Sequence, residues 1–436
     1  MTDPRPSILF VNQHYWPDFA STGQHLTDLA EHLAADGFDV HVLCSRGKYL
    51  AGKMELPKQE QRNGVTIRRV SATAFGRGSH LGRLMDYASF YLLALWHVLF
   101  GRRHDAVVML TTPPLLGAIG ALARAIRGSR YGIWSMDLHP DAEEAIGMIK
   151  PGSALSRLLH GLNGWGYRRA DFVIDLGFVM KARLEAKGVH PDRLRTIPVW
   201  SDRNEIYPVA PADNPLRAEL GLQNKFVVMY SGNAGLAHRF DEVMEAMRRL
   251  RDHPSVYFLF VGNGPRRAEI ETFVQAEGLT NFRYLDYFGR DQLAQSLSLG
   301  DVHLLTLRED MAGIAVPGKL YGIMAAARPT VMVGPRVSEP AQVITSERVG
   351  ELVVPGPDAG ARLAGLLVSM ASRPGATAAT GARARQVFLD QFDRDVCCAQ
   401  WASMLREHLG LAQPAPARTA RPVARPAARR TRAVPA

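Results

Sequence analysis

Residues 226–250, FVVMYSGNAGLAHRFDEVMEAMRRL, decide the fold class of this 436-residue chain. An apolar run at 226–231 ends in a turn that contains glycine, and an amphipathic stretch follows the turn. This order is typical of a strand followed by a helix, the repeating unit of a parallel sheet that helices cover on both faces. The stretch therefore predicts an α/β fold.

The same alternation continues on both sides of this stretch and is interrupted once. Residues 204–224 are rich in Pro, Asn and Ala, and no long apolar run crosses them. We therefore predict two Rossmann-like domains that face each other across a cleft, as the length of the chain also suggests. The predicted segments are an N-terminal domain at 1–205, a linker at 206–224, a second domain at 225–390, a helix at 391–410 that returns to the first domain, and a disordered tail rich in Ala, Pro and Arg at 411–436.

Composition and charge exclude several classes of protein. Hydrophobic residues make up 47% and charged residues 22% of the chain, as in a soluble globular protein. The formal net charge is +10, but six arginines of the tail carry more than half of it, and no nucleic-acid-binding motif accompanies them. A nucleic-acid partner is therefore not expected. The tail either binds an anionic membrane or is solvated without a partner.

We expect the chain to stay in the cytoplasm, at the inner face of the plasma membrane. Its first residues, MTDPRPSILFVNQHYWP, lack the charged and apolar regions of a secretory signal. The most apolar window, residues 84–100, is at the lower length limit for a membrane-spanning helix. Arg83, Arg102 and Arg103 flank this window. It therefore predicts either a helix that docks peripherally on a membrane or a helix of the domain core.

The most informative candidate site lies at residues 316–319, VPGK, where a helix is predicted to begin. Proline and glycine before a helix leave its first N–H groups free, and Lys319 adds a full positive charge at the same place. The helix dipole and the ammonium group would together hold a diphosphate there. Glu339 begins another predicted helix, where it either accepts hydrogen bonds from ribose hydroxyls or only stabilises the start of the helix.

Two glycine turns follow predicted strands of the second domain and permit a ligand to approach the backbone closely. One turn contains Gly232 and Asn233 and leads to His238, and the other contains Asn263 and Gly264. The second turn lacks the full spacing of a dinucleotide-binding motif, so a dinucleotide site is not expected.

Polar residues of the first domain are expected on the opposite side of the cleft. Ser21, Thr22 and Gly23 open a predicted helix, where they either bind a phosphate or sugar hydroxyls or act as an ordinary helix cap. Asp137 and His139 follow a predicted strand and are the expected acceptor-side groups. Alternatively, Asp137 only caps the turn that follows it.

Taken together, these stretches resemble the retaining glycosyltransferases of family 4, which have the two-domain GT-B fold. SGNAGLAHRFDEVMEAMRRL at 231–250 is similar to the first strand and helix of the family's donor domain, and VGNGPRRAEIE at 261–271 to its second glycine turn. VPGKLYGIMAAARP at 316–329 looks like its donor-binding helix. In the first domain, TTPPLLGAIGALARAIRG at 111–128 and WSMDLHPDAEEAIG at 134–147 resemble the branch that builds bacterial O-antigen, capsule and exopolysaccharide units.

The resemblance implies a transfer of a hexosyl or N-acetylhexosaminyl group with retention of the anomeric configuration. The donor would be a nucleotide-sugar, UDP-linked in preference to GDP-linked, and the acceptor a polyprenyl-linked or other saccharide. No metal ion and no cofactor are expected. The expected catalytic residues are Asp137 and Lys319. The residues expected to bind the donor are Gly232, Asn233, His238, Asn263, Gly264, Gly318, Lys319, Tyr321 and Glu339.

The chain departs from the family pattern at two donor-side positions. The family usually carries two glutamates eight positions apart, one touching the sugar and one the ribose, and this chain has Ile314 and Gly322 there. Glu339 is the expected substitute for the ribose contact. Glu309 and Asp310 are weaker candidates for the contact with the sugar.

A further departure is Met136, which stands where many relatives have a histidine and leaves Asp137 as the matching polar residue. Because the glutamate pair is missing, a non-catalytic protein that binds a sugar nucleotide is one alternative. A nucleotide-sugar 2-epimerase of the same fold is another, and it would need acid and base carboxylates in the cleft.

Overall fold

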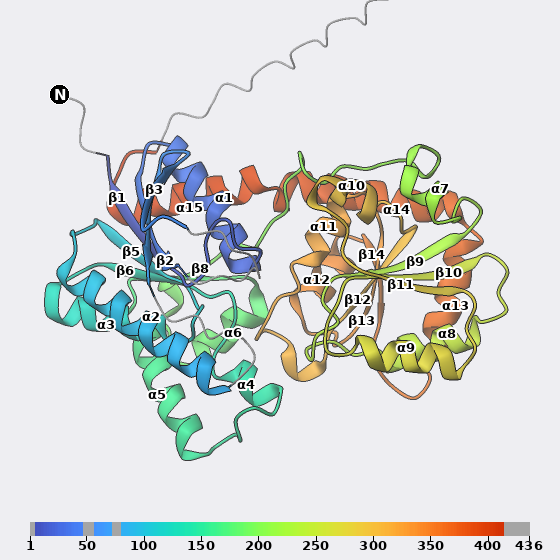
Figure 1. Ribbon diagram of the computed structural model, residues 1–436, viewed down its shortest axis with the longest axis horizontal. Coiled ribbons are helices and arrows are strands. Elements are labelled where there is room, and N and C mark those ends of the chain that lie inside the picture. Colours follow the sequence, from blue (N-terminus) through green and yellow to red (C-terminus); the bar gives the residue numbers. More distant parts are fainter. Residues whose placement is uncertain (1–4, 47–55, 72–79, 414–436) are drawn as a thin grey trace, which may run out of the picture.

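The chain folds into two domains that lie side by side, each built around a mostly parallel sheet with helices on both faces (Figure 1). The computed structural model describes residues 5–46, 56–71 and 80–413. The predicted fold class, two Rossmann-like α/β domains, is confirmed. Beyond residue 413, the predicted tail lies outside the described residues.

The first sheet has the strand order β3-β4-β2-β1-β5-β6-β7-β8. Its strands are β1 (Ser7–Val11), β2 (Asp39–Ser45), β3 (Gln59–Arg62), β4 (Val65–Val70), β5 (Ala106–Met109), β6 (Tyr131–Trp134), β7 (Phe172–Asp175) and β8 (Leu194–Thr196). The helices around it are α1 (Ser21–Ala35), α2 (His80–Phe100), α3 (Leu116–Arg127), α4 (Asp141–Ala145), α5 (Ala154–Arg169) and α6 (Phe178–Ala186).

Strand β3 is the one element of the first sheet that the apolar pattern does not predict. Its sequence, QEQR, has no apolar residue. It lies at the edge of the sheet and pairs antiparallel with β4, whereas the other neighbouring strands run parallel. A polar edge strand needs little burial, so the apolar signal of a central strand is missing.

The second sheet is parallel throughout and has the order β11-β10-β9-β12-β13-β14. Its strands are β9 (Phe226–Ser231), β10 (Val256–Val261), β11 (Phe282–Leu285), β12 (Val302–Thr306), β13 (Thr330–Val333) and β14 (Gly350–Val353). Its helices are α7 (Pro215–Glu219), α8 (Asp241–Arg249), α9 (Arg267–Ala276), α10 (Leu293–Leu297), α11 (Lys319–Ala325), α12 (Glu339–Ser346), α13 (Ala359–Ala371) and α14 (Pro374–Val387).

The two sheets place a ligand site where their strand orders reverse. In an open parallel sheet, ligands bind beside the carboxyl ends of the strands at this reversal. It lies between β1 and β5 in the first sheet and between β9 and β12 in the second. Strand β1 and the apolar residues of β9 are buried, so each chain segment becomes polar only where its strand ends.

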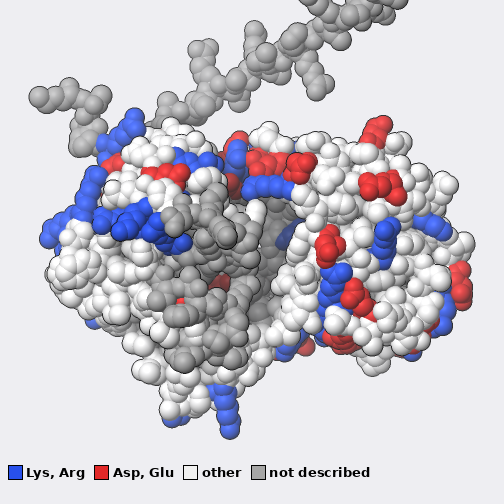
Figure 2. Space-filling view, in the orientation of Figure 1, with Lys and Arg blue, Asp and Glu red and all other residues white. Residues whose placement is uncertain are grey.

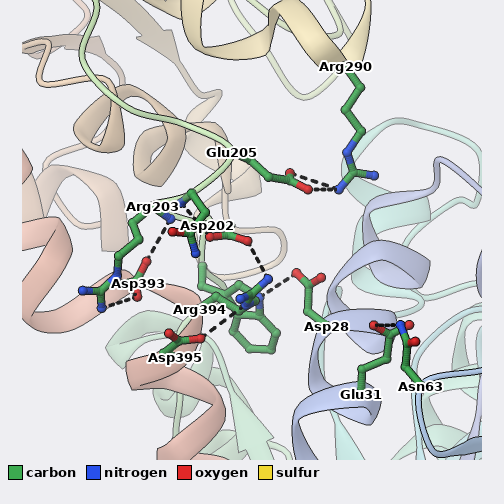
Figure 3. Close-up of polar contacts among 12 residues, drawn as sticks. Asp28, Glu31, Asn63, Asp202, Arg203, Glu205, Arg290, Asp393, Arg394 and Asp395 are labelled. Carbon is green, nitrogen blue, oxygen red and sulfur yellow. Dashed lines mark hydrogen bonds and ion pairs between the residues drawn. The ribbon is translucent and has the colours of Figure 1, made fainter. Parts of the chain in front are cut away.

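Within the described residues the chain crosses between the domains twice, and the two crossings are bonded to each other. Ser201 forms a parallel bridge with Asp393, and the N–H of Arg394 donates to the carbonyl of Ser201 at 2.9 Å. Ion pairs join Arg203 to Asp393 and Arg394 to Asp202 (Figure 3). We call Asp202, Arg203, Asp393 and Arg394 the crossing clasp.

Helix α15 (Arg394–Leu409) returns to the first domain as predicted. The side chain of Trp401 is fully buried, and its ring centroid lies 4.8 Å from that of Trp134 in β6. Near the end of the helix, Arg406 forms an ion pair with Asp36, which follows α1. Helix α15 is therefore part of the first domain's core.

The apolar window predicted at 84–100 lies in α2. Within the described residues, none of the helices combines the length and the apolar character that a bilayer crossing requires.

Replacing Trp401 with alanine is expected to lower the free energy of unfolding by about 3–5 kcal/mol, because it removes a large side chain from a packed core. Ser403→Ala is the matched control, since Ser403 is exposed on the same helix. Urea unfolding followed by far-UV circular dichroism measures both variants. Equal transition midpoints would contradict the packing of α15 on the first domain.

Candidate active site

Lys319 and His238, both predicted to bind the donor, lie together at the carboxyl end of β9. Lys319 is the first residue of α11, and its Nζ donates a hydrogen bond to the hydroxyl of Tyr230 at 2.8 Å. The same Nζ lies 4.2 Å from the centroid of the Tyr230 ring, at the distance of a cation–π contact. It is also 3.4 Å from Nε2 of His238.

The hydrogen bonds of His238 decide which of its nitrogens carries the proton. Its Nδ1 lies 2.6 Å from the carbonyl oxygen of Thr306, so Nδ1 carries the hydrogen and donates. Nε2 is then an acceptor and faces the ammonium group of Lys319. Burial, followed by the charge of Lys319, lowers the pKa of His238 to about 3, so the imidazole is neutral at neutral pH.

The Lys319 ammonium is poorly solvated. Burial lowers the pKa of Lys319 to about 7, far below the usual value of a lysine. Its two nearest polar partners, Tyr230 and His238, are both neutral, and among the described residues no carboxylate forms an ion pair with it. The position therefore favours an anionic ligand that would supply the missing countercharge.

The two predicted glycine turns pack against each other beside Lys319. A Cβ atom at Gly232 would lie 3.3 Å from Nζ of Lys319, and one at Gly264 would lie 2.6 Å from the backbone nitrogen of Ala234. The N–H of Ala234 donates to the carbonyl of Asn263 at 2.7 Å. Gly232 and Gly264 have positive φ angles of 133° and 137°, a conformation that favours glycine. A side chain at position 232 would fill the space beside the ammonium group, and one at position 264 would collide with the backbone of the other turn.

Asn233 belongs to the same pair of turns. Its Oδ1 would lie 2.6 Å from a Cβ atom at Gly264, so the amide side chain packs between the turns. Asn263 accepts a hydrogen bond from the N–H of Gly264 through its own Oδ1, at 2.8 Å. The structure thus brings Gly232, Asn233, His238, Asn263 and Gly264 to one end of the second sheet, with Lys319.

A loop of the second domain that precedes α11 docks on the first domain. The N–H of Leu138 donates to the carbonyl of Ile314 at 2.9 Å, and Asp137 pairs with Ala315 in an antiparallel bridge. Nε of Arg183 donates to the carbonyl of Ala312 at 2.8 Å. Ile314, which stands where the family usually has a glutamate, is buried in this contact. It is an apolar part of the domain interface.

The first-domain residues predicted on the acceptor side lie in different places. Asp137 is in the domain interface, its N–H donates to Oγ1 of Thr111 at 3.3 Å, and burial raises the pKa of its carboxyl group. His139 lies 2.7 Å from Oε1 of Glu143 and lines a small pocket within the first domain. Although burial opposes the charged form, the hydrogen bond and charge of Glu143 raise the pKa of His139.

Ser21, Thr22 and Gly23 form the first turn of α1. The N-cap residue is Ala20, which has no side-chain oxygen, and the cap interpretation of Ser21 and Thr22 is therefore wrong. Gly23 lies close to the loop after β1, since a Cβ atom there would be 3.2 Å from the carbonyl carbon of His14.

Tyr321 and Glu339 line a cavity that Lys319 does not line. This cavity, of about 440 Å³, lies between the two domains and the segment around Phe392. The rings of Tyr321 and Phe392 are tilted by 33° to each other, with a centroid distance of 4.7 Å. Oε1 of Glu339 accepts a hydrogen bond from the N–H of Met180, in α6 of the first domain, at 2.8 Å. Their contact with a donor stays a prediction.

Three further candidates can be placed. Gly318 is the N-cap of α11 and lies against Val199, which follows β8. Glu309 begins a single helical turn, and Asp310 forms an ion pair with Arg308. Within the part of the chain that the structure describes, no group of three or more His, Cys, Asp or Glu residues has the arrangement of a metal site.

Tyr230 is the site residue that the sequence does not reveal. It lies inside the apolar run of β9, where an aromatic residue is expected to belong to the core. Its ring is buried, and its hydroxyl accepts from Lys319 and donates to the carbonyl of Asn233 at 2.9 Å.

Comparisons with known proteins agree with this architecture. The family described as "Glycosyl transferase 4-like domain" matches residues 22–200, and the family "Glycosyl transferases group 1" matches residues 213–385. WcaI of Escherichia coli, which bears the name of a colanic acid biosynthesis glycosyl transferase, is 28% identical over 348 residues, or 77% of this chain and 85% of WcaI.

Solved structures share the whole fold. Sucrose-phosphate synthase from Thermosynechococcus elongatus has a TM-score of 0.74 at 19% identity and covers 93% of this chain and 100% of its own. HepE of Anabaena, solved in complex with UDP, has a TM-score of 0.68 at 18% identity, over 92% of this chain and 100% of its own. The two family matches follow one another along the two domains, and the chain therefore belongs to the family 4 glycosyltransferases with the GT-B fold.

Proposed function

We propose that this glycosyltransferase moves a sugar from a nucleotide-sugar to a lipid-linked or other saccharide acceptor, with retention of the anomeric configuration. The observation that carries the proposal is the Lys319 ammonium group, held between Tyr230 and His238 beside two glycine turns. A donor diphosphate supplies the countercharge that this group lacks. UDP is the favoured nucleotide, and HepE, a structural neighbour, was solved with UDP.

The proposed reaction needs little covalent chemistry from the protein. The bond between the anomeric carbon and the diphosphate oxygen breaks, and a bond to the acceptor oxygen forms on the same face of the sugar. The acceptor proton passes to the leaving diphosphate. Lys319 stabilises the negative charge that develops on the diphosphate, and the domains position the two substrates. Because this ammonium group supplies the positive charge, we propose no metal ion and no cofactor.

Asp137 is proposed to act on the acceptor side of the cleft. It lies where the first domain touches the loop before α11, and burial raises the pKa of its carboxyl group. A carboxyl group in this setting can accept a hydrogen bond from the acceptor hydroxyl and orient it. Transfer of a hexosyl or N-acetylhexosaminyl group is proposed for the same site.

We place the reaction in the synthesis of bacterial surface polysaccharides, at the inner face of the plasma membrane. The name of WcaI supports the first part. Helix α2 supports the second, because Met85, Leu92, Trp96 and Phe100 form an exposed apolar stripe at helical spacing along it. Such a stripe fits an anionic membrane surface that carries a polyprenyl-linked acceptor.

Replacing Lys319 with alanine is expected to lower kcat/KM for the donor about 10²- to 10³-fold, since it removes the charge that stabilises the leaving group. The measurement is nucleotide release from UDP- and GDP-sugars with a polyprenyl-diphosphate sugar as acceptor. Lys150→Ala, which removes an exposed lysine of the first domain, is the control and should leave the rate unchanged.

Two outcomes would count against the transferase. Release that needs no acceptor and survives the change of Lys319 would favour a nucleotide-sugar 2-epimerase. Absence of release from every donor that binds would favour a non-catalytic protein.

The affinity for UDP is expected to fall as the pH rises above 7. The pKa of Lys319 is about 7, so the ammonium group loses its proton above that pH. Bound diphosphate favours the charged form, and binding above pH 7 must therefore take up a proton. Between pH 7 and 9 the Kd should rise by up to about tenfold per pH unit.

Isothermal titration calorimetry with UDP at several pH values measures this dependence. Lys319→Arg is the control, because a guanidinium group stays charged over the whole range and its Kd should be flat. A flat Kd for the unchanged protein would show that Lys319 does not titrate there.

A further inference from the structure

A second pocket lies in the first domain, between the carboxyl end of α2 and strands β1 to β4. It has a volume of about 230 Å³. The basic side chains that line it are three histidines and two arginines, namely His41, His97, His104, Arg68 and Arg102. We call this the basic pocket.

The basic pocket is separate from the candidate active site. In a parallel sheet covered by helices, each helix runs antiparallel to the strands it connects. The carboxyl end of α2 therefore lies beside the amino ends of the strands, whereas the cleft is formed at their carboxyl ends. Figure 2 shows Lys and Arg side chains gathered on the first domain at the end that faces away from the second domain.

The positive groups of the basic pocket are only partly compensated. Asp39 pairs with His41 at 3.0 Å and with Arg102 at 2.9 Å. Within residues 5–46, 56–71 and 80–413, no other carboxylate forms an ion pair with the five basic side chains. The rings of His41 and His104 lie 4.8 Å apart, and Nδ1 of His104 is 2.8 Å from the hydroxyl oxygen of Ser7.

The basic groups also disfavour one another's charged forms. Burial, followed by the charges of His41 and Arg102, lowers the pKa of His104 to about 4. Burial and the charge of Arg68 lower the pKa of His97. An anion in the pocket would offset this repulsion and accept hydrogen bonds from the imidazoles.

The size and the surroundings of the pocket narrow the class of anion. Its volume is below the roughly 300–1,000 Å³ of pockets that enclose drug-sized ligands, so it suits a small group such as a phosphate. His97 lies on α2 with Trp96 and Phe100. The side chains of Trp96 and Phe100 are 63% and 66% exposed, and their ring centroids lie 4.4 Å apart. An exposed aromatic pair beside a basic pocket is typical of a surface at the membrane interface.

We propose that the basic pocket binds the phosphate of an anionic membrane lipid while the apolar stripe of α2 enters the headgroup region. Arg68 and Arg102 pair with the phosphate oxygens, and the imidazoles of His97 and His104 donate hydrogen bonds to them. This inference rests on the proposed membrane location and is independent of the donor chemistry.

The test is binding of the full chain to vesicles of phosphatidylcholine, alone or mixed with phosphatidylglycerol. The unchanged protein should bind the mixed vesicles more tightly. Arg68→Gln should weaken that binding about fivefold, the effect of removing one positive charge near an anionic surface. Arg283→Gln makes the same charge change at an exposed position of edge strand β11, and it should leave vesicle binding unchanged.

Several results would overturn the inference. One is that Arg283→Gln weakens vesicle binding as much as Arg68→Gln does. Another is equally tight binding to the two kinds of vesicle. A third is that Arg68→Gln lowers the affinity for inorganic phosphate while vesicle binding stays the same. The Kd for UDP of each variant reads the donor site separately. Loss of vesicle binding by Arg68→Gln with an unchanged Kd for UDP supports the basic pocket, whatever the donor assay shows.

Discussion

The geometry of the cleft depends on the crossing clasp. Two segments far apart in the sequence, 201–203 and 393–394, meet there through opposite charges and backbone hydrogen bonds. Asp393 is buried, so its pairing with Arg203 offsets the cost of removing a charge from water. The clasp fixes one end of the interface, and contacts such as Leu138 with Ile314 form at the other side of it.

Two more charges extend this constraint into both domains. Glu205, which follows the crossing clasp, pairs with Arg290 of the second domain at 2.7 Å, and Asp28 of α1 accepts from the indole nitrogen of Trp200 at 3.0 Å (Figure 3). Burial, more than any other factor, raises the pKa of Asp28 to about 6. The segment that holds Trp200 and Glu205 is therefore bonded to both domains.

Much of the fold could be predicted because the buried strands are recognisable from their apolar sequences. Runs such as 226–231 are short and apolar, and such runs are typical of strands in a sheet that helices cover on both faces. Strand β3 could not be predicted in this way, because it is an edge strand made of polar residues. The cap interpretation of Ser21 and Thr22 was wrong, because their side chains suit an N-cap as well as a first turn.

The candidate site could be predicted only in part. Lys319 and His238 were found from glycine turns and charge, whereas Tyr230 was hidden in an apolar strand. Tyr321 follows Lys319 by two positions, which on a helix means a rotation of about 200°. Its side chain therefore packs on Phe392 while Lys319 faces Tyr230. That Ile314 forms a buried domain contact depends on tertiary structure, which spacing alone does not contain.

The return of α15 to the first domain also sets the order in which the protein can be completed during synthesis. Trp401 packs beside Trp134, and it can reach this position only after all the residues between them have left the ribosome. The first domain therefore exposes the apolar surface that α15 covers until the whole second domain has been synthesised. A chaperone that shields exposed apolar surface would have its longest contact with the domain that is translated first.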